Sequence, residues 1–159
     1  MTAVLGLAQA LMLAMAVQTA PQAASQTAPL VAARPAEAWT WTLYNGEGPL
    51  VLANEIPDTP RLRTTLECMP GSSIARLAFH ETPGVGGYAT VRSGAASAEV
   101  ETRSRRGRLE TALRADHPVF AAFLASGRLS LTVGDQTLSI EIDRANLPKL
   151  RRFAELCTG

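Results

Sequence analysis

The stretch from Leu129 to Ile142, LSLTVGDQTLSIEI, decides the fold class of this chain of 159 residues. Apolar residues alternate with polar ones on both sides of Gly134 and Asp135. A period of two is typical of a half-buried β-strand, and a Gly-Asp pair between two such runs is typical of a tight hairpin turn. We therefore predict two antiparallel strands here, each with one buried face and one solvated face.

Upstream of this hairpin, similar short runs are separated by Gly, Pro, Asn and Asp, which favour turns. The further expected strands are 39–44, 50–54, 61–69, 74–80, 88–92, 98–103 and 108–114. A β-α-β rhythm is absent, which argues against a doubly wound sheet. The predicted fold class is mainly β (α+β). It is an antiparallel β-sandwich or partly open barrel, with a short helix before the last hairpin and a C-terminal helix.

Two helices are expected in the last third of the chain. For the first, Asp116 is the expected N-cap and Gly127 the expected end, because glycine tolerates the left-handed conformation that ends a helix. For the second, Asn146 is the expected N-cap. Its apolar stripe consists of Leu147, Leu150, Phe153, Ala154 and Cys157.

Cys68 and Cys157 are the two cysteines of the chain. Cys68 has the same parity as Leu66 in an expected strand, and Cys157 lies on the apolar stripe of the last helix, so both sulfurs should point inward. An even number of cysteines in an exported chain indicates a disulfide. The alternative is a pair of buried free thiols.

The N-terminal region has the composition of an export signal. Residues 3–17 are almost wholly apolar and are followed by small residues, yet the run is shorter than the ~20 residues of a membrane-spanning helix. We expect a signal peptide over 1–24, a disordered Ala/Pro-rich tether over 25–38, and a single β-rich domain over 39–159. The alternatives are a buried helix or an uncleaved anchor. We expect a periplasmic or secreted protein with no membrane span in the mature chain.

Charge and composition narrow the function classes. The formal net charge is +1, which does not favour nucleic acid as a partner. Two Cys and two His exclude Cys-rich zinc modules and iron–sulfur proteins. The spacing of His80, Glu81, Asp116 and His117 is not that of a known metal motif. We expect no metal and no cofactor.

A serine hydrolase is the alternative enzymatic hypothesis. Ser72 or Ser73, His80 or His117, and Asp116 supply the residue types that a catalytic triad needs. The GxSxG motif that positions the nucleophile in many hydrolases is absent. We therefore predict no catalytic residue.

The densest charge of the chain lies at the end of an expected hairpin, where Arg103, Arg105, Arg106 and Arg108 occur within six positions. Guanidinium groups bind carboxylates and phosphates, so these four arginines are the predicted binding residues. The expected partner is an envelope protein or an anionic polymer. The alternative is a solvated loop that prevents edge-to-edge strand pairing.

Trp39 and Trp41 have the same parity at the start of the expected domain. Exposed, they would form a platform for a sugar or a peptide. The alternative, which we favour, is that they seal one end of the core.

The C-terminal stretch LSIEIDRANLPKLRRFAELC, Leu138–Cys157, resembles the end of small exported proteins of Gram-negative bacteria that carry one disulfide from an early strand to a final helix. It is also loosely similar to TagO/VasI-type accessory proteins of type VI secretion, although the early cysteine of that family is absent. The resemblance implies a compartment and a topology, and no catalytic residue. We expect an exported, non-enzymatic binding or accessory protein. The alternatives are a small periplasmic serine hydrolase and a structural envelope protein held by an uncleaved leader.

Overall fold

The computed structural model describes residues 38–82, 84 and 86–159. The expected signal peptide over 1–24 and all of the expected tether except Ala38 lie outside the described residues. The strands are β1 (Thr40–Tyr44), β2 (Leu50–Glu55), β3 (Leu62–Cys68), β4 (Ile74–Phe79), β5 (Gly87–Ser93), β6 (Ala96–Arg105), β7 (Arg108–Arg114), β8 (Arg128–Val133) and β9 (Gln136–Glu141). The helices are α1 (Pro118–Ser126) and α2 (Leu147–Thr158). Neither of these helices is long and apolar enough to cross a membrane.

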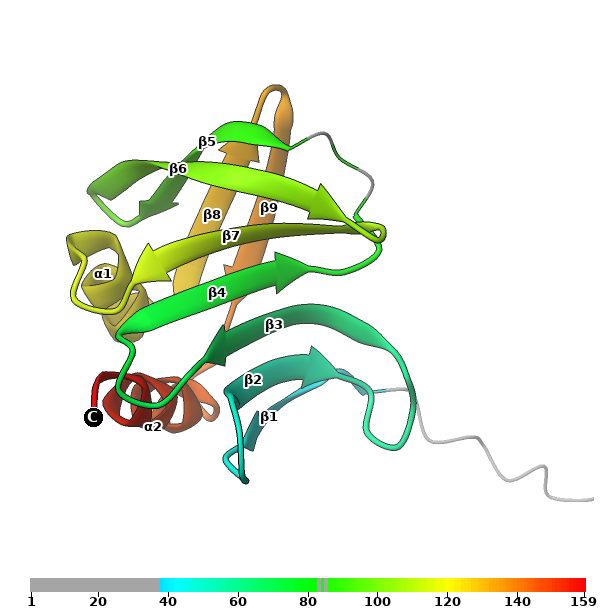
Figure 1. Ribbon diagram of the computed structural model, residues 1–159, viewed down its shortest axis with the longest axis vertical. Helices are drawn as coiled ribbons and strands as arrows, with labels where there is room; N and C mark the ends of the chain where they lie inside the picture. The colour runs from blue at the N-terminus through cyan, green and yellow to red at the C-terminus, as the bar shows by residue number, and fades with distance from the viewer. Residues whose placement is uncertain (1–37, 83, 85) are drawn as a thin grey trace, which may run out of the picture. The chain divides into compact units, whose positions relative to one another are not determined.

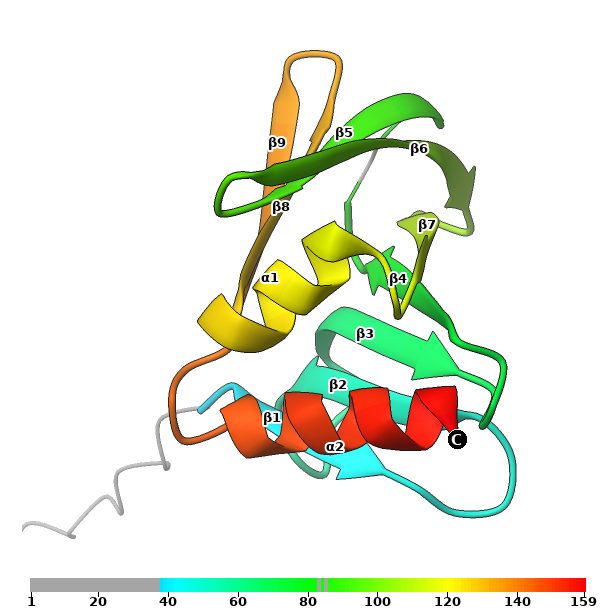
Figure 2. The same ribbon diagram turned by 90° about the vertical axis from the view of Figure 1, so that its left-hand side faces the viewer.

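The strands form one antiparallel sheet in the order β1-β2-β3-β4-β7-β6-β5-β8-β9. This sheet curls around both helices, which pack on its inner face, α1 against β5 and β6 and α2 against β1 and β2 (Figures 1 and 2). The predicted mainly-β class is therefore confirmed. Of the two expected architectures, the partly open barrel is the one observed, because a sandwich needs a second sheet.

The predicted C-terminal hairpin is confirmed. Strands β8 and β9 pair with Leu131 opposite Leu138 and Leu129 opposite Ile140. Gly134 in the turn has φ of 55°, a left-handed conformation that glycine adopts without steric penalty. The alternation of the sequence places Leu131 and Ile140 in the core with the other inner-face side chains.

The core is one continuous cluster between the inner face of the sheet and the two helices. Its largest fully buried side chains are Phe120, Phe123, Phe153, Leu52, Leu66, Leu77, Leu109, Leu131, Ile140 and Leu150. Each such side chain contributes about 1.5–3 kcal/mol to folding by leaving water. The sheet and both helices therefore share one core.

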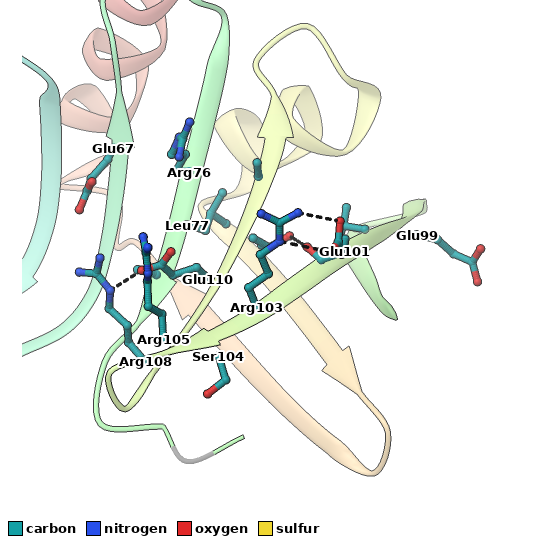
Figure 3. Close-up of a pocket in the computed structure, with 14 residues that line it drawn as sticks. Glu67, Arg76, Leu77, Glu99, Glu101, Arg103, Ser104, Arg105, Arg108 and Glu110 are labelled. Atoms are coloured by element: carbon teal, nitrogen blue, oxygen red, sulfur yellow. Dashed lines mark hydrogen bonds and ion pairs between the residues drawn. The ribbon is translucent and has the colours of Figure 1, made fainter. Parts of the chain in front are cut away.

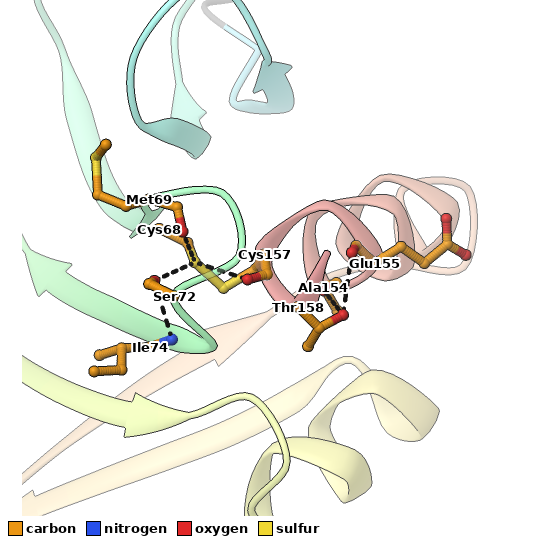
Figure 4. Close-up of a disulfide and its surroundings, with 8 residues drawn as sticks. All are labelled: Cys68, Met69, Ser72, Ile74, Ala154, Glu155, Cys157 and Thr158. Carbon is orange, nitrogen blue, oxygen red and sulfur yellow. Dashed lines mark hydrogen bonds between the residues drawn. A yellow bond between two sulfur atoms is a disulfide. The ribbon is translucent and has the colours of Figure 1, made fainter.

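The predicted disulfide is confirmed. Cys68 at the end of β3 is bonded to Cys157 in α2, with a Cα–Cα distance of 5.6 Å (Figure 4). The two residues are only 2% and 0% exposed. The main chain supports the link, because the backbone N–H of Ser73 donates to the carbonyl of Cys157 at 3.0 Å. The bridge therefore fixes the last helix to the turn between β3 and β4.

The expected N-cap of α1 is wrong. The cap is His117, whose Nδ1 accepts a hydrogen bond from the backbone N–H of Val119 at 3.1 Å. Asp116 does not cap, because Arg114 engages both of its carboxylate oxygens, at 2.8 and 2.5 Å. The end of the helix is as predicted, with Gly127 at φ 71°.

Asn146 occupies the expected N-cap position of α2 without capping it through its side chain. Its amide donates instead to the carboxylate of Asp143 at 2.8 Å. The Asn146 side chain therefore stabilises the loop that precedes α2 instead of the first turn of the helix.

Candidate functional site

The outer face of the sheet, which turns away from the helices, carries the charged side chains of the central strands. In β7, Leu109 and Thr111 are buried against the core, so Arg108 and Glu110, which alternate with them, face outward. The same alternation in β6 buries Thr102 and turns its odd-numbered neighbours outward. Because side chains alternate along each strand, burying the apolar residues on the inner face places the charged residues on the outer face.

The predicted arginines lie at the end of the β6–β7 hairpin. Arg106 and Gly107 form its two-residue turn with φ of 51° and 76°. Positive φ at both positions is the mark of a type I′ turn, whose twist matches that of paired strands. Arg105 and Arg108, which flank the turn, lie directly opposite each other in the ladder. The turn therefore holds two like charges side by side.

Glutamates neutralise two of the four predicted binding residues. The guanidinium of Arg103 donates to both carboxylate oxygens of Glu101, at 3.2 and 3.4 Å. Arg108 forms an ion pair with Glu110. The predicted patch is therefore less positive than its sequence indicates.

Arg105 and Arg106 form no ion pair within the described residues. A hollow in the protein surface, described below, lies beside the hairpin. Arg105 lines this hollow, whereas Arg106 is in the turn and does not. The two residues therefore have similar charge and exposure and a different relation to the hollow.

The hollow has a volume of about 750 Å³ and lies on the outer face over β3, β4, β7 and β6 (Figure 3). Small side chains form its floor, with Ala78 only 6% exposed and Ala112 beside it. Long charged side chains surround this floor. The hollow exists because the alanine side chains are much shorter than those around them. We call it the outer groove; its charged lining is Glu67, Arg76, Glu99, Glu101, Arg103, Arg105, Arg108 and Glu110.

Arg76 is a groove residue that the sequence analysis missed. It lies between Glu67 of β3 and Ala112 of β7 in the strand register. Like Arg105, it forms no ion pair in the part of the chain that the structure describes. The only sequence signal for Arg76 was its position on the polar side of an alternating strand. Arg76 and Arg105 are thus the two groove arginines that have no ion pair among the described residues.

His80 follows β4, and its Nε2 lies 3.2 Å from the hydroxyl of Thr65. Burial, and after it the positive charge of Arg108, lower the pKa of His80 below its ordinary value. The imidazole of His80 is therefore protonated less readily than that of a free histidine.

The residues of the hydrolase hypothesis have other partners. Ser72 lies 3.3 Å from the sulfur of Cys68, His117 caps α1, and Asp116 pairs with Arg114. No hydrogen bond joins a serine to a histidine among residues 38–82, 84 and 86–159. Over the same residues, no group of three or more His, Cys, Asp and Glu side chains could hold a metal ion.

The two tryptophans do not form a platform. Trp41 is 4% exposed and belongs to the core. Trp39 precedes β1, and the guanidinium of Arg63 lies 3.9 Å from its ring centroid. Such a cation–π contact contributes about 0.5–1 kcal/mol at an exposed site.

Comparisons with family models, curated proteins and solved structures found no match to this chain. A proposal for the function therefore has to rest on the residues of the outer groove. A guanidinium group without an ion-pair partner, such as that of Arg76 or Arg105, can donate several hydrogen bonds to a carboxylate or phosphate.

Proposed function

We propose that this chain is an exported, non-enzymatic binding protein that holds an anionic group of its partner in the outer groove. The observation that carries the proposal is the position of Arg105 directly opposite Arg108. Like charges directly across a ladder destabilise a sheet. Glu110 compensates only Arg108, so a bound anion would remove the remaining repulsion.

Arg76 of β4, directly opposite Ala112, supplies a second guanidinium that lines the groove and has no ion pair among the described residues. A carboxylate or a phosphate matches the fork of guanidinium donors, whereas a neutral ligand would leave the charges uncompensated. Because these side chains are exposed, binding should weaken as salt is added, with a screening length of about 10 Å at 0.1 M.

Export is the part of the proposal that rests on the disulfide and the apolar leader. A buried Cys68–Cys157 bridge persists in oxidising compartments and is rare in a reducing cytosol. Cell fractionation with N-terminal sequencing tests it. A mature chain in the periplasm or medium that begins near residue 25 is the expected result. A mature chain in the cytosol would contradict export, and an intact leader in the envelope would favour the anchored structural protein.

Anion binding is tested with the full-length oxidised protein and two probes, polyglutamate and inorganic polyphosphate. We expect the double variant R76S/R105S to bind at least about tenfold more weakly than the parent protein. R106S is the matched control, because it removes one exposed arginine outside the groove and should change the affinity little. Equal loss in both variants would reduce the site to a diffuse surface charge.

A fluorophosphonate probe tests the enzymatic alternative. We expect no labelling, since Ser72 and Ser73 lack a histidine partner among the described residues. Labelling of either serine would contradict the non-enzymatic assignment.

A further inference from the structure

The charge of the outer groove changes sign along β6. The outward-facing residues run from Glu99 and Glu101 through Arg103 to Arg105. Figure 3 shows the two glutamates on one side, the Arg105 side chain on the other and Arg103 between them. We call Glu99 and Glu101 the acidic end, and Arg105 with Arg108 the basic end.

An exposed aromatic ring stands at the acidic end. Tyr88 lies directly opposite Glu101 in the pairing of β5 with β6, and it is 84% exposed. Glu99, opposite Thr90 in the same pairing, forms no ion pair within the described residues. Carboxylates and an exposed aromatic ring on the same face of a sheet together favour the binding of an ammonium or guanidinium group.

The basic end offers the opposite chemistry. Arg105 and Arg108 face each other there, and of these two only Arg108 has an ion-pair partner among the described residues. An anion is therefore favoured at one end of the groove and a cation at the other.

We infer that the ligand of the outer groove is a short zwitterionic peptide in an extended conformation, with its carboxylate at the basic end and its cationic group at the acidic end. This inference rests on the proposed function and specifies its ligand. A strand rises about 3.3 Å per residue, so positions 101 and 105 are roughly 13 Å apart. An extended peptide spans that distance between residues four positions apart.

A uniform polyanion fits the groove less well. Lying along β6, it would bring negative charge onto Glu99 and Glu101, which face outward from that strand and line the groove. Facing like charges across an interface is unfavourable and selects against the wrong partner. The acidic end thus provides the specificity that the arginines alone lack.

The test uses three pentapeptides with blocked termini and the full-length oxidised protein, isotope-labelled for NMR titration. Their sequences are Lys-Gly-Ser-Gly-Glu, Glu-Gly-Ser-Gly-Glu and Lys-Gly-Ser-Gly-Lys. We expect the zwitterionic peptide to bind at least about tenfold more tightly than the other two and to shift signals at both ends of the groove. Equal or tighter binding of the dianionic peptide would overturn the inference.

Variants at the acidic end separate this inference from the proposed function. E99Q and Y88S should each weaken binding of the zwitterionic peptide several-fold and should not weaken binding of the dianionic one. E47Q is the matched control, because Glu47 is exposed in the β1–β2 turn outside the groove. If E99Q has no effect while R76S/R105S still weakens polyphosphate binding at least about tenfold, the inference fails and the proposed function stands. If neither a peptide nor polyphosphate binds, both fail.

Discussion

The indole nitrogen of Trp41 donates a hydrogen bond to the main-chain oxygen of Glu141 at 3.1 Å. Trp41 belongs to β1 and Glu141 to β9, which are the two ends of the strand order. Lys149 of α2 donates in turn to the carbonyl of Trp41 at 2.5 Å. The two free edges of the sheet are therefore joined by a side chain and a helix rather than by a ladder.

The hydrogen bond between Trp41 and Glu141, which we call the seam hydrogen bond, leads to a prediction for W41F. Phenylalanine keeps most of the buried ring and removes the donor to Glu141, so we expect a loss of about 1–3 kcal/mol in the free energy of unfolding. Urea denaturation measures it. W39F is the control, because Trp39 lies outside the core and retains a ring for Arg63. Equal stability of W41F and the parent protein would show that the seam hydrogen bond does not matter.

The disulfide predicts a larger effect. A bridge between residues 68 and 157 constrains the unfolded chain, and the chain-entropy model gives roughly 4–5 kcal/mol for a loop of this length. We expect C68S/C157S to lose most of that in guanidinium denaturation and the reduced parent protein to match it. Thiol counting on denatured, unreduced protein should find no free thiol. Two free thiols would contradict the bridge.

The turn of the β6–β7 hairpin predicts a stabilising substitution. Arg106 has φ of 51°, a conformation that costs a residue with a Cβ about 1 kcal/mol, and Asn-Gly is the preferred pair for this turn. R106N should therefore raise the free energy of unfolding by about 0.5–1 kcal/mol. R144N, at a residue without positive φ, should leave it unchanged. A destabilised R106N protein would contradict the turn assignment.

The facing arginines predict that stability and binding move in opposite directions. R105E converts a repulsive cross-strand pair with Arg108 into an attractive one, worth about 0.2–1 kcal/mol. The same change removes an unpaired guanidinium from the outer groove. We expect a more stable protein in thermal unfolding that no longer binds polyphosphate. If R105E still binds polyphosphate, Arg105 is not an anion-binding residue.

His80 predicts a pH dependence of folding. Its folded-state pKa is lowered from 6.5, first by burial and then by Arg108. The unfolded chain therefore takes up a proton that the folded chain resists, and stability falls as the pH drops from about 6.5 through the folded-state pKa. Urea denaturation at pH 7.5 and pH 5.5 should show a smaller drop in H80Q than in the parent protein. An equal drop would show that another group is responsible.

Local patterns allowed much of the fold to be predicted. The alternation of residues 129–142 fixes which side chains of β8 and β9 are buried, because strand parity is a property of neighbours. Gly127 ends α1 for an equally local reason, and Cys68 and Cys157 each lie on a buried stripe. These features do not depend on how distant segments meet.

What the sequence could not reveal depends on strand order and on competition between partners. Asp116 fails as a cap because Arg114 takes its carboxylate. Arg76 and Arg105 line one groove because β4 pairs with β7 and β7 pairs with β6, an arrangement that no run of neighbouring residues specifies. The partner of Trp41 lies one hundred residues further along the chain. The sequence therefore predicts the hairpin part of the candidate site, including Arg105. The part supplied by Arg76 depends on the register of the strands.

The bond between Cys68 and Cys157 also makes the chain a closed covalent loop from the end of β3 to the last helix. Strands β4 to β9, and with them Arg76 and Arg105, lie inside this loop. A protease that cuts once at any exposed turn between these cysteines leaves one linked molecule until the sulfurs are reduced. The two arginines thus remain in one covalently linked molecule after such a cut, whereas a cut between β1 and Cys68 breaks the covalent link of β1 to the rest of the chain.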